Sequence, residues 1–172
     1  KEADTYTPSR GQDVAESIAK DLRADISYRL YSGDDIKSDP DISFSRMLSY
    51  RSDLRIALEP LLKNPAYELE VFASYLDTKD TSHLEDLRNI AQNYRAATES
   101  AVNILVPEDA VPYHLAILNA LSEFEAVLEK MTANADDPYA TAALLRTFGG
   151  AEANMLLSFD ALAGYFREYS RS

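Results

Sequence analysis

The sequence predicts an all-α fold, an up-and-down helical bundle of five or six helices. Apolar residues recur at spacings of three and four along most of the 172-residue chain, as they do in helices with one buried face. No segment sustains the alternation of apolar and polar residues that marks a half-buried strand. The 7 prolines stand where the periodic segments begin or stop, and a helical chain tolerates them there.

The first two expected helices lie toward the N-terminus. Residues 11–31 place apolar side chains four apart in one stripe: Val14, Ile18, Leu22, Ile26 and Leu30. A second helix is expected to start at Asp39-Pro40, with Asp39 as N-cap and Pro40 in the first helical position, and to stop near Asn64-Pro65. Its expected apolar face consists of Phe44, Met47, Leu48, Leu54, Leu58 and Leu61.

The next two helices differ in length. Residues 66–76 predict a short helix, with an apolar face made of Leu69, Phe72, Ala73 and Leu76. The run from Ser82 to Glu85 has the pattern of a capping box, in which each of the two side chains bonds the other residue's backbone. It is expected to open a long helix that closes before Pro107, with the apolar face Leu84, Leu87, Ile90, Tyr94, Ala97, Ala101 and Ile104.

The last two helices each begin at a proline. Pro112 starts one helix, with Leu115, Leu118, Leu121, Leu128 and Met131 on one side. Asp137-Pro138 opens the other, whose apolar positions are Leu144, Phe148, Ala151, Met155, Phe159, Leu162 and Phe166. The spacing of three and four between apolar positions stays in register across Gly149-Gly150. We therefore expect one continuous helix to about Tyr169, although each glycine costs roughly 1 kcal/mol of helix propensity.

Length and composition indicate one domain that covers residues 1–172, because 46% hydrophobic residues suffice for a core. The 29 acidic and 17 basic residues give a net charge of -12, which repels phosphate backbones and excludes nucleic acid from the expected partners. The absence of cysteine excludes disulfides, thiolate metal sites and cysteine nucleophiles. No run of about 18 apolar residues is available to span a membrane.

No spacing of a metal or catalytic site occurs around the two histidines. His83 follows Asp80 by three residues and His114 follows Val111, so neither belongs to a Glu-x-x-His pair. A glycine-rich phosphate loop and a Gly-x-Ser-x-Gly turn are also missing. The sequence therefore predicts no catalytic residue, no metal ligand and no cofactor.

An acidic loop follows the first expected helix. Its carboxylates lack the alternation, central glycine and terminal glutamate of a calcium loop. We interpret them as helix caps and solvated charges, with weak cation binding as the alternative. They are Asp34, Asp35, Asp39 and Asp41.

His114 and Asn119 are the two polar residues of an otherwise apolar run, residues 114–119, in the helix that starts at Pro112. The first interpretation is a buried hydrogen-bond network that fastens this helix to a neighbour. The alternative is a polar pair in a pocket that binds a small ligand. A structure separates the two, because a ligand site requires both side chains to face one open cavity.

Tyrosine is abundant, with 11 residues and no tryptophan, and it is concentrated in the first half of the chain. Tyrosines at helix edges often bury the ring and leave the hydroxyl in water. An exposed set would instead form an interaction surface. The candidates for that surface are Tyr28, Tyr31, Tyr50, Tyr67 and Tyr75.

Residues 104–166 contain a set of short motifs, which lie at the starts of expected helices or on their apolar faces. They are Val111-Pro112, His114-Leu115, Leu118-Asn119-Ala120, Met131, Asp137-Pro138-x-Ala140 and Tyr165-Phe166. On these motifs the chain resembles uncharacterised small helical proteins of candidate-phylum bacteria with reduced genomes, which usually carry an N-terminal export signal or anchor. The resemblance implies an exported or membrane-tethered protein, in agreement with a chain that starts at Lys1, and it implies no activity. The region of residues 32–81 is longer in this chain than in the compact pattern of the group. We expect the additional residues to form a helical hairpin where a partner binds.

These observations favour a non-enzymatic extracytoplasmic domain that acts through protein–protein contacts, in a cell-surface or secretion-related assembly. The partner is an unidentified protein, and a membrane is contacted only through a missing N-terminal anchor. One alternative is a small-ligand binder or enzyme with a pocket near His114 and Asn119. The other is a cytosolic helical adaptor, which differs mainly in its compartment.

Overall fold

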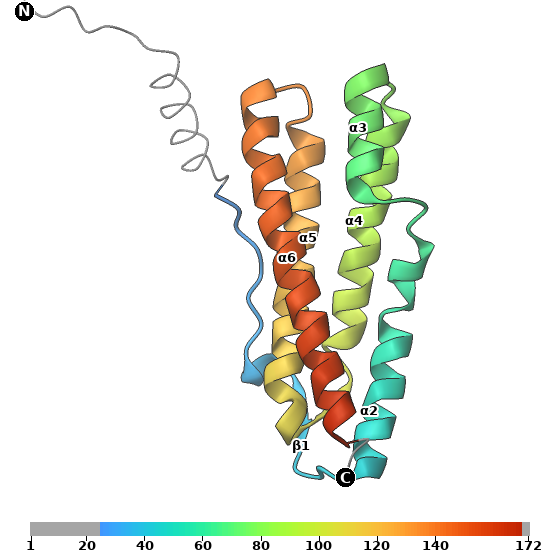
Figure 1. Ribbon diagram of the computed structural model, residues 1–172, viewed down its shortest axis with the longest axis vertical. Coiled ribbons are helices and arrows are strands. Elements are labelled where there is room, and N and C mark those ends of the chain that lie inside the picture. The colour runs from blue at the N-terminus through green and yellow to red at the C-terminus, as the bar shows by residue number, and fades with distance from the viewer. Residues whose placement is uncertain (1–24, 170–172) are drawn as a thin grey trace, which may run out of the picture.

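The computed structural model describes residues 25–169 and is mostly helical (77%), which confirms the all-α class. The α-helices are α2 (Phe44–Ala57), α3 (Glu68–Thr78), α4 (Ser82–Ala101), α5 (Val111–Ala133) and α6 (Pro138–Tyr169). In the view of Figure 1, α2 and α3 run upward, α4 runs downward, α5 upward and α6 downward. Because residues 1–24 lie outside the described residues, the predicted total of five or six helices stays a prediction.

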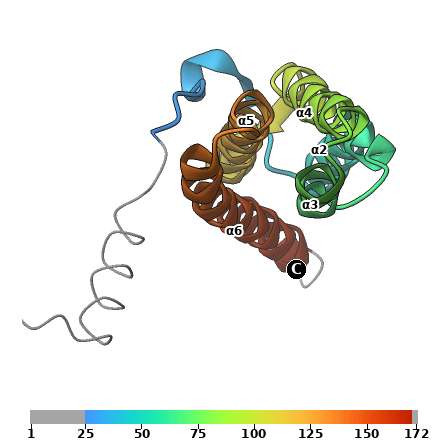
Figure 2. The same cartoon turned by 90° about the horizontal axis from the view of Figure 1, so that it is seen from above.

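α2 and α3 lie end to end and run in the same direction (Figure 1). A 3-10 helix, η2 (Glu59–Lys63), joins them, and α4 returns antiparallel beside the whole column (Figure 2). Within residues 32–81 the chain therefore builds one broken column rather than the expected hairpin of two antiparallel helices. The break follows from Pro60, which has no N–H to donate and which clashes with the preceding turn of a helix.

One hydrophobic core runs through the bundle, centred on α4 and α5. The predicted faces of these two helices are confirmed, since Leu87, Ile90, Leu118 and Leu121 are fully buried. The Phe124 ring lies at the middle of the core, 4.9 Å from the Tyr94 ring and 4.9 Å from the Phe148 ring. The core thus joins α4, α5 and α6 through aromatic contacts.

The predicted start of α6 is confirmed and that of α2 is wrong, while α4 begins at Ser82, where it was expected, but without the predicted capping box. The Asp137 carboxylate accepts hydrogen bonds from the backbone N–H groups of Tyr139 (2.9 Å) and Ala140 (3.1 Å), as an N-cap does. α6 then continues without interruption through both glycines, as expected.

Helix α2 begins four residues after the predicted proline. The Ser43 hydroxyl caps it by accepting from the Arg46 N–H at 3.2 Å, while Asp39 and Pro40 precede the helix. Asp39 is instead part of a strand, so its backbone is already committed to another segment.

Helix α4 has no capping box at Ser82. Ser82 is itself helical, and the Asp80 carboxylate accepts from its N–H at 2.9 Å. A carboxylate two residues earlier therefore satisfies the helix start in place of the predicted Ser82 to Glu85 pair.

Helix α3 buries a different face from the predicted one. Leu76 and Ala73 are exposed, and the buried residues are Glu68, Val71, Phe72 and Tyr75. Glu68 can be buried because the Tyr94 hydroxyl donates to its carboxylate at 2.9 Å. Val71, Phe72 and Tyr75 keep the spacing of one helix face, but the sequence gives no reason to place the carboxylate of Glu68 on that face.

Two short strands, absent from the predicted elements, pair in parallel at the lower end of the bundle. β1 (Lys37–Asp39) lies beside β2 (Leu105–Pro107), with Ser38 opposite Val106. Single-turn 3-10 helices, η1 (Gly33–Asp35) and η3 (Glu108–Ala110), flank the pair. Three residues are too few for a strand alternation to be visible in a sequence.

The first expected helix, residues 11–31, falls mostly outside the described residues. Its last part, residues 25–31, is not helical and runs along the bundle (Figure 1). There the Tyr31 backbone bonds to α5 instead of to a helical turn of its own. Ile26 and Leu30 consequently do not continue a helical stripe.

Candidate functional site

His114 lies on α5 with none of its surface exposed. Its Nδ1 atom is 3.1 Å from the hydroxyl of Tyr50 on α2, and the two rings meet edge to face. Burial raises the pKa of Tyr50, so its hydroxyl keeps its proton and serves as donor. The pair is a buried link between α2 and α5, and a fully buried imidazole lines no cavity that is open to solvent.

The environment of His114 favours the neutral imidazole. Burial lowers its pKa to about 4, against a smaller opposite effect of the Ala101 backbone carbonyl. With Nδ1 accepting from Tyr50, the ring proton belongs on Nε2, which makes no hydrogen bond of regular geometry. A neutral histidine in this position joins two helices, and its lowered pKa disfavours protonation near neutral pH.

Asn119 serves a different part of the fold. Its side-chain amide accepts from the Tyr31 N–H at 2.7 Å and donates to the Tyr31 carbonyl at 3.2 Å. Both bonds hold the extended residues 25–31 against α5. His114 and Asn119 therefore face different neighbours, and the structure does not bring them together at one site.

The five candidate tyrosines do not share a surface. Tyr50 and Tyr75 are buried, and the Tyr75 hydroxyl donates to Asp136 at 2.6 Å. Tyr67 is exposed and donates to Glu152 of α6 at 2.8 Å, and burial and this carboxylate raise its pKa to about 12. Tyr28 and Tyr31 are half-buried in the extended segment. Tyr28 and Tyr31 line one pocket together, whereas the other three rings lie at separate junctions.

The acidic loop provides turns and caps. Asp35 accepts from the Ser32 N–H at 2.8 Å, and Asp41 accepts from the Ser43 N–H at 2.8 Å. These backbone hydrogen bonds are the main cause of the lowered pKa of each carboxyl. The interpretation as capping residues is supported. Among residues 25–169 no group of three or more His, Asp or Glu side chains could hold a metal ion.

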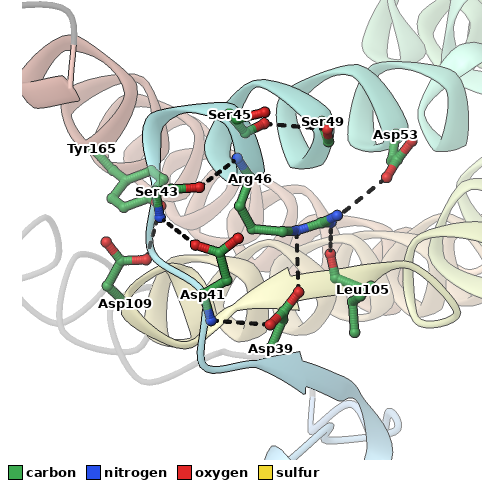
Figure 3. A network of polar contacts seen from close by, with 10 residues as sticks. All are labelled: Asp39, Asp41, Ser43, Ser45, Arg46, Ser49, Asp53, Leu105, Asp109 and Tyr165. Carbon is green, nitrogen blue, oxygen red and sulfur yellow. Dashed lines mark hydrogen bonds and ion pairs between the residues drawn. The ribbon is translucent and has the colours of Figure 1, made fainter.

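Arg46 organises the lower end of the bundle (Figure 3). Its guanidinium donates to the Leu105 carbonyl at 2.6 Å and lies 3.8 Å from the carboxylates of Asp39 and Asp53. One side chain of α2 thus contacts both β1 and β2. This contact fixes the first turn of α2 against the paired strands.

A second polar cluster fixes the same end of α2 to the end of α6. The Asp109 carboxylate accepts from the Tyr165 hydroxyl at 3.0 Å and also contacts the Tyr169 hydroxyl. Tyr169 in turn lies 2.9 Å from the Ile42 carbonyl, just before α2. Because of these contacts, α2 and α6 run antiparallel as direct neighbours (Figure 1).

Between these two helices lies a groove of about 350 Å³, which we call the α2–α6 groove. Buried Leu54 and Leu162 lie deepest, half-buried Leu58 and Phe159 follow, and Leu62 is 85% exposed. The lining is apolar except for two arginines. It consists of Arg51, Leu54, Arg55, Leu58, Leu62, Phe159, Leu162, Ala163 and Phe166.

The apolar surface continues beyond the groove along α2. Phe44 is 52% exposed and Leu48 is also exposed, and both follow the line of Arg51 and Arg55 at helical spacing. α2 therefore presents apolar residues on two sides, of which only the side with Met47 is buried in the core.

The α2–α6 groove is the feature that sequence reasoning missed. The sequence places Phe44, Met47 and Leu48 in one buried stripe, but the structure buries Met47 alone. A signal was present, because the apolar residues of α2 occupy too wide an arc for one helix face. Which part of that arc meets the core depends on α6, more than 80 residues away in sequence.

None of the described helices is both long and apolar enough to cross a membrane. Comparison of the chain with protein-family models, with curated proteins and with solved structures found no match.

Proposed function

We propose that this chain is a non-catalytic helical domain that binds another protein through the α2–α6 groove. The observation that supports the proposal is the exposure of apolar side chains in and beside the groove, with Leu62 85% exposed and Phe44 52% exposed. Contiguous apolar surface costs free energy in water and marks interaction sites in folded proteins.

The shape of the groove favours a protein partner over a small ligand. It is open along its length and has no buried polar group that would orient a small molecule. Two antiparallel helices with leucines on both walls instead suit a third helix, which presents apolar residues at i, i+3, i+4 and i+7.

We propose further that the domain acts outside the cytoplasm, tethered or secreted. The support is the resemblance of residues 104–166 to exported or anchored helical proteins of candidate-phylum bacteria. Fractionation of cells that express the full-length gene measures this directly. Recovery of the protein only in the cytosol would contradict the location and favour the cytosolic adaptor.

Site-specific photo-crosslinking tests the groove itself. A photoreactive phenylalanine analogue replaces Leu62 in the groove or, as matched control, Leu157, which is 68% exposed on another side of α6. We expect a defined adduct in cells with the Leu62 probe and none with the Leu157 probe, and mass spectrometry identifies the partner.

The identified partner is then purified and its binding is measured. Leu62→Ser is expected to weaken its affinity at least about tenfold, because a hot-spot leucine at an interface is lost. Leu157→Ser is expected to leave it unchanged. Equal crosslinking from both positions, or equal affinity of both variants, would contradict a role of the groove.

A further inference from the structure

The only charged side chains that line the α2–α6 groove are Arg51 and Arg55. They stand out in a chain with a net charge of -12. Four other arginines of residues 25–169 are paired with carboxylates, among them Arg46 with Asp39 and Arg95 with Glu125 and Glu129. Neither groove arginine has an ion-pair partner among residues 25–169. Arg88 and Arg146 have no such ion pair within this range either, but they lie outside the groove.

The positions of the two guanidinium groups define a spacing. Arg51 and Arg55 are four residues apart on α2 and therefore lie one helical turn apart along one wall of the groove. The Arg51 guanidinium lies 5.8 Å from the centre of the Phe166 ring, so its position is fixed against the apolar lining. Its N–H groups have no carboxylate acceptor among the described residues.

We propose that the partner presents an acidic amphipathic helix, with apolar residues for the groove and carboxylates one turn apart for Arg51 and Arg55. The inference rests on the proposed function and adds the chemistry of the partner. Arginine is suited to this role, because its planar guanidinium binds carboxylates in a bidentate geometry and is more weakly hydrated than an ammonium group.

The net negative charge of the whole chain does not oppose this choice at contact distance. Charges more than about 8 Å from the site are largely screened at physiological salt. The groove lining itself carries two positive charges and no carboxylate. A second copy of the chain fits less well, because it brings the same two arginines and another -12 charges. A flat bilayer surface does not enter a groove between two helices.

Paired peptides test the proposal on the full chain. Both are helical, of about 16 residues, with the same leucine spacing. One carries glutamates at i and i+4 beside the leucines, and the other carries lysines there. Fluorescence anisotropy at about 0.15 M salt is expected to show the acidic peptide binding at least about tenfold more tightly than the basic one.

Charge reversal then assigns the preference to the two arginines. The double variant Arg51→Glu, Arg55→Glu is expected to reverse the preference between the peptides. A matched double variant, Arg88→Glu, Arg146→Glu, changes the net charge equally at exposed positions outside the groove. It is expected to keep the preference for the acidic peptide. Circular dichroism verifies that both variants are folded.

The outcomes separate this inference from the proposed function. If both peptides bind equally and Leu62→Ser weakens both, the groove binds helices but the acidic partner is wrong. If Leu62→Ser changes neither peptide and the crosslinks are also unspecific, the proposed function is wrong as well. A dimer in sedimentation velocity that Leu62→Ser abolishes, or groove-dependent binding to anionic vesicles, would also overturn the acidic helix.

Discussion

Tyr50 and His114 show how single residues hold this bundle together. They are 64 positions apart in sequence, and their hydrogen bond is the buried polar link between α2 and α5. Removing one partner leaves the other unsatisfied in the core, which costs more than the bond itself contributes.

We expect Tyr50→Phe to lower the free energy of unfolding by about 1–3 kcal/mol, because Nδ1 of His114 loses its donor. Urea unfolding measures the change. The control is Tyr139→Phe, at a position 84% exposed, which is expected to alter stability by less than about 0.5 kcal/mol. In the double variant Tyr50→Phe, His114→Leu both polar groups are absent, so no unsatisfied group remains in the core. We therefore expect this variant to recover part of the free energy of unfolding that Tyr50→Phe loses. Equal stability of Tyr50→Phe and the wild type would show that the link is dispensable.

The buried histidine also predicts a pH dependence. Its pKa falls from about 6.5 in the unfolded chain to about 4 in the fold. Between these values the unfolded state binds more protons, so stability decreases as the pH falls from about 7 to about 4, and the contribution is complete above about pH 7. The shift corresponds to roughly 3 kcal/mol.

Urea unfolding of the wild type and of the double variant Tyr50→Phe, His114→Leu across this range measures the effect. Carboxylates titrate in both proteins, and only the wild type has the histidine contribution. We expect the wild type to lose more stability on acidification. Parallel pH profiles would show that His114 gains protons as readily in the fold as in the unfolded chain.

Residue types alone identified His114 and Asn119 as polar residues in an apolar helix, and both do fasten α5 to neighbours. Their partners, Tyr50 and Tyr31, were not predictable, because each comes from a segment more than 60 residues away. Sequence spacing gives the face of a helix on which a residue lies, but not what meets that face.

Among the elements, α6 offers the cleanest test of helix propensity. Gly149 and Gly150 lie within the helix, and a Cβ atom on either meets nothing within 4 Å. The glycines therefore provide no close packing that would offset their entropic cost.

Gly149→Ala is expected to raise the free energy of unfolding by about 0.5–1 kcal/mol. Thermal unfolding followed by circular dichroism measures the change. The reciprocal control is Ala153→Gly, at an exposed position one turn further along α6, which is expected to lower stability by a similar amount. A lower stability of Gly149→Ala would mean that the pair has a role that its surroundings do not reveal.

Sequence predicted α4, α5 and α6 well, because each is long and its apolar stripe matches one packed face. α2 was predicted poorly. Asp39-Pro40 has the composition of a helix start, yet β2 takes up the backbone there and Ser43 caps the helix. Local signals decide a helix boundary only where no other segment competes for the backbone.

For the whole molecule, charge is the dominant long-range term. The net charge of -12 produces self-repulsion in the compact state, whereas ion pairs such as Lys79 with Asp136, Arg95 with Glu129 and Arg167 with Asp160 are exposed and each contributes little. Salt weakens both effects, and we expect the repulsion to be the larger one.

Raising NaCl from about 0.01 M to about 0.5 M is therefore expected to increase Tm, as the screening length falls from about 30 Å to a few ångströms. Differential scanning calorimetry measures the change. KCl serves as a control for ion-specific effects and is expected to act equally. A decrease of Tm would indicate that ion pairs such as Arg95 with Glu125 outweigh the repulsion.

For the whole molecule, the sequence predicted the class of fold but not the contacts that join distant segments. The strand pair, the extended residues 25–31 and the α2–α6 groove all depend on contacts between distant segments, and a local pattern does not identify the segment that makes each contact. The groove was accordingly absent from the predicted sites, and its residues were assigned to a buried stripe.

The contact between Tyr169 and the Ile42 carbonyl joins positions 127 residues apart. Closing so long a loop is slow, whereas the hairpins α4–α5 and α5–α6 form from neighbouring parts of the chain. We therefore expect α2 to dock last during folding and to detach first by local opening, so that amide hydrogens of α2 exchange faster than those of α4 and α5. A partner helix in the groove would slow this exchange, and protection of α2 would then report on occupancy without any label on the partner.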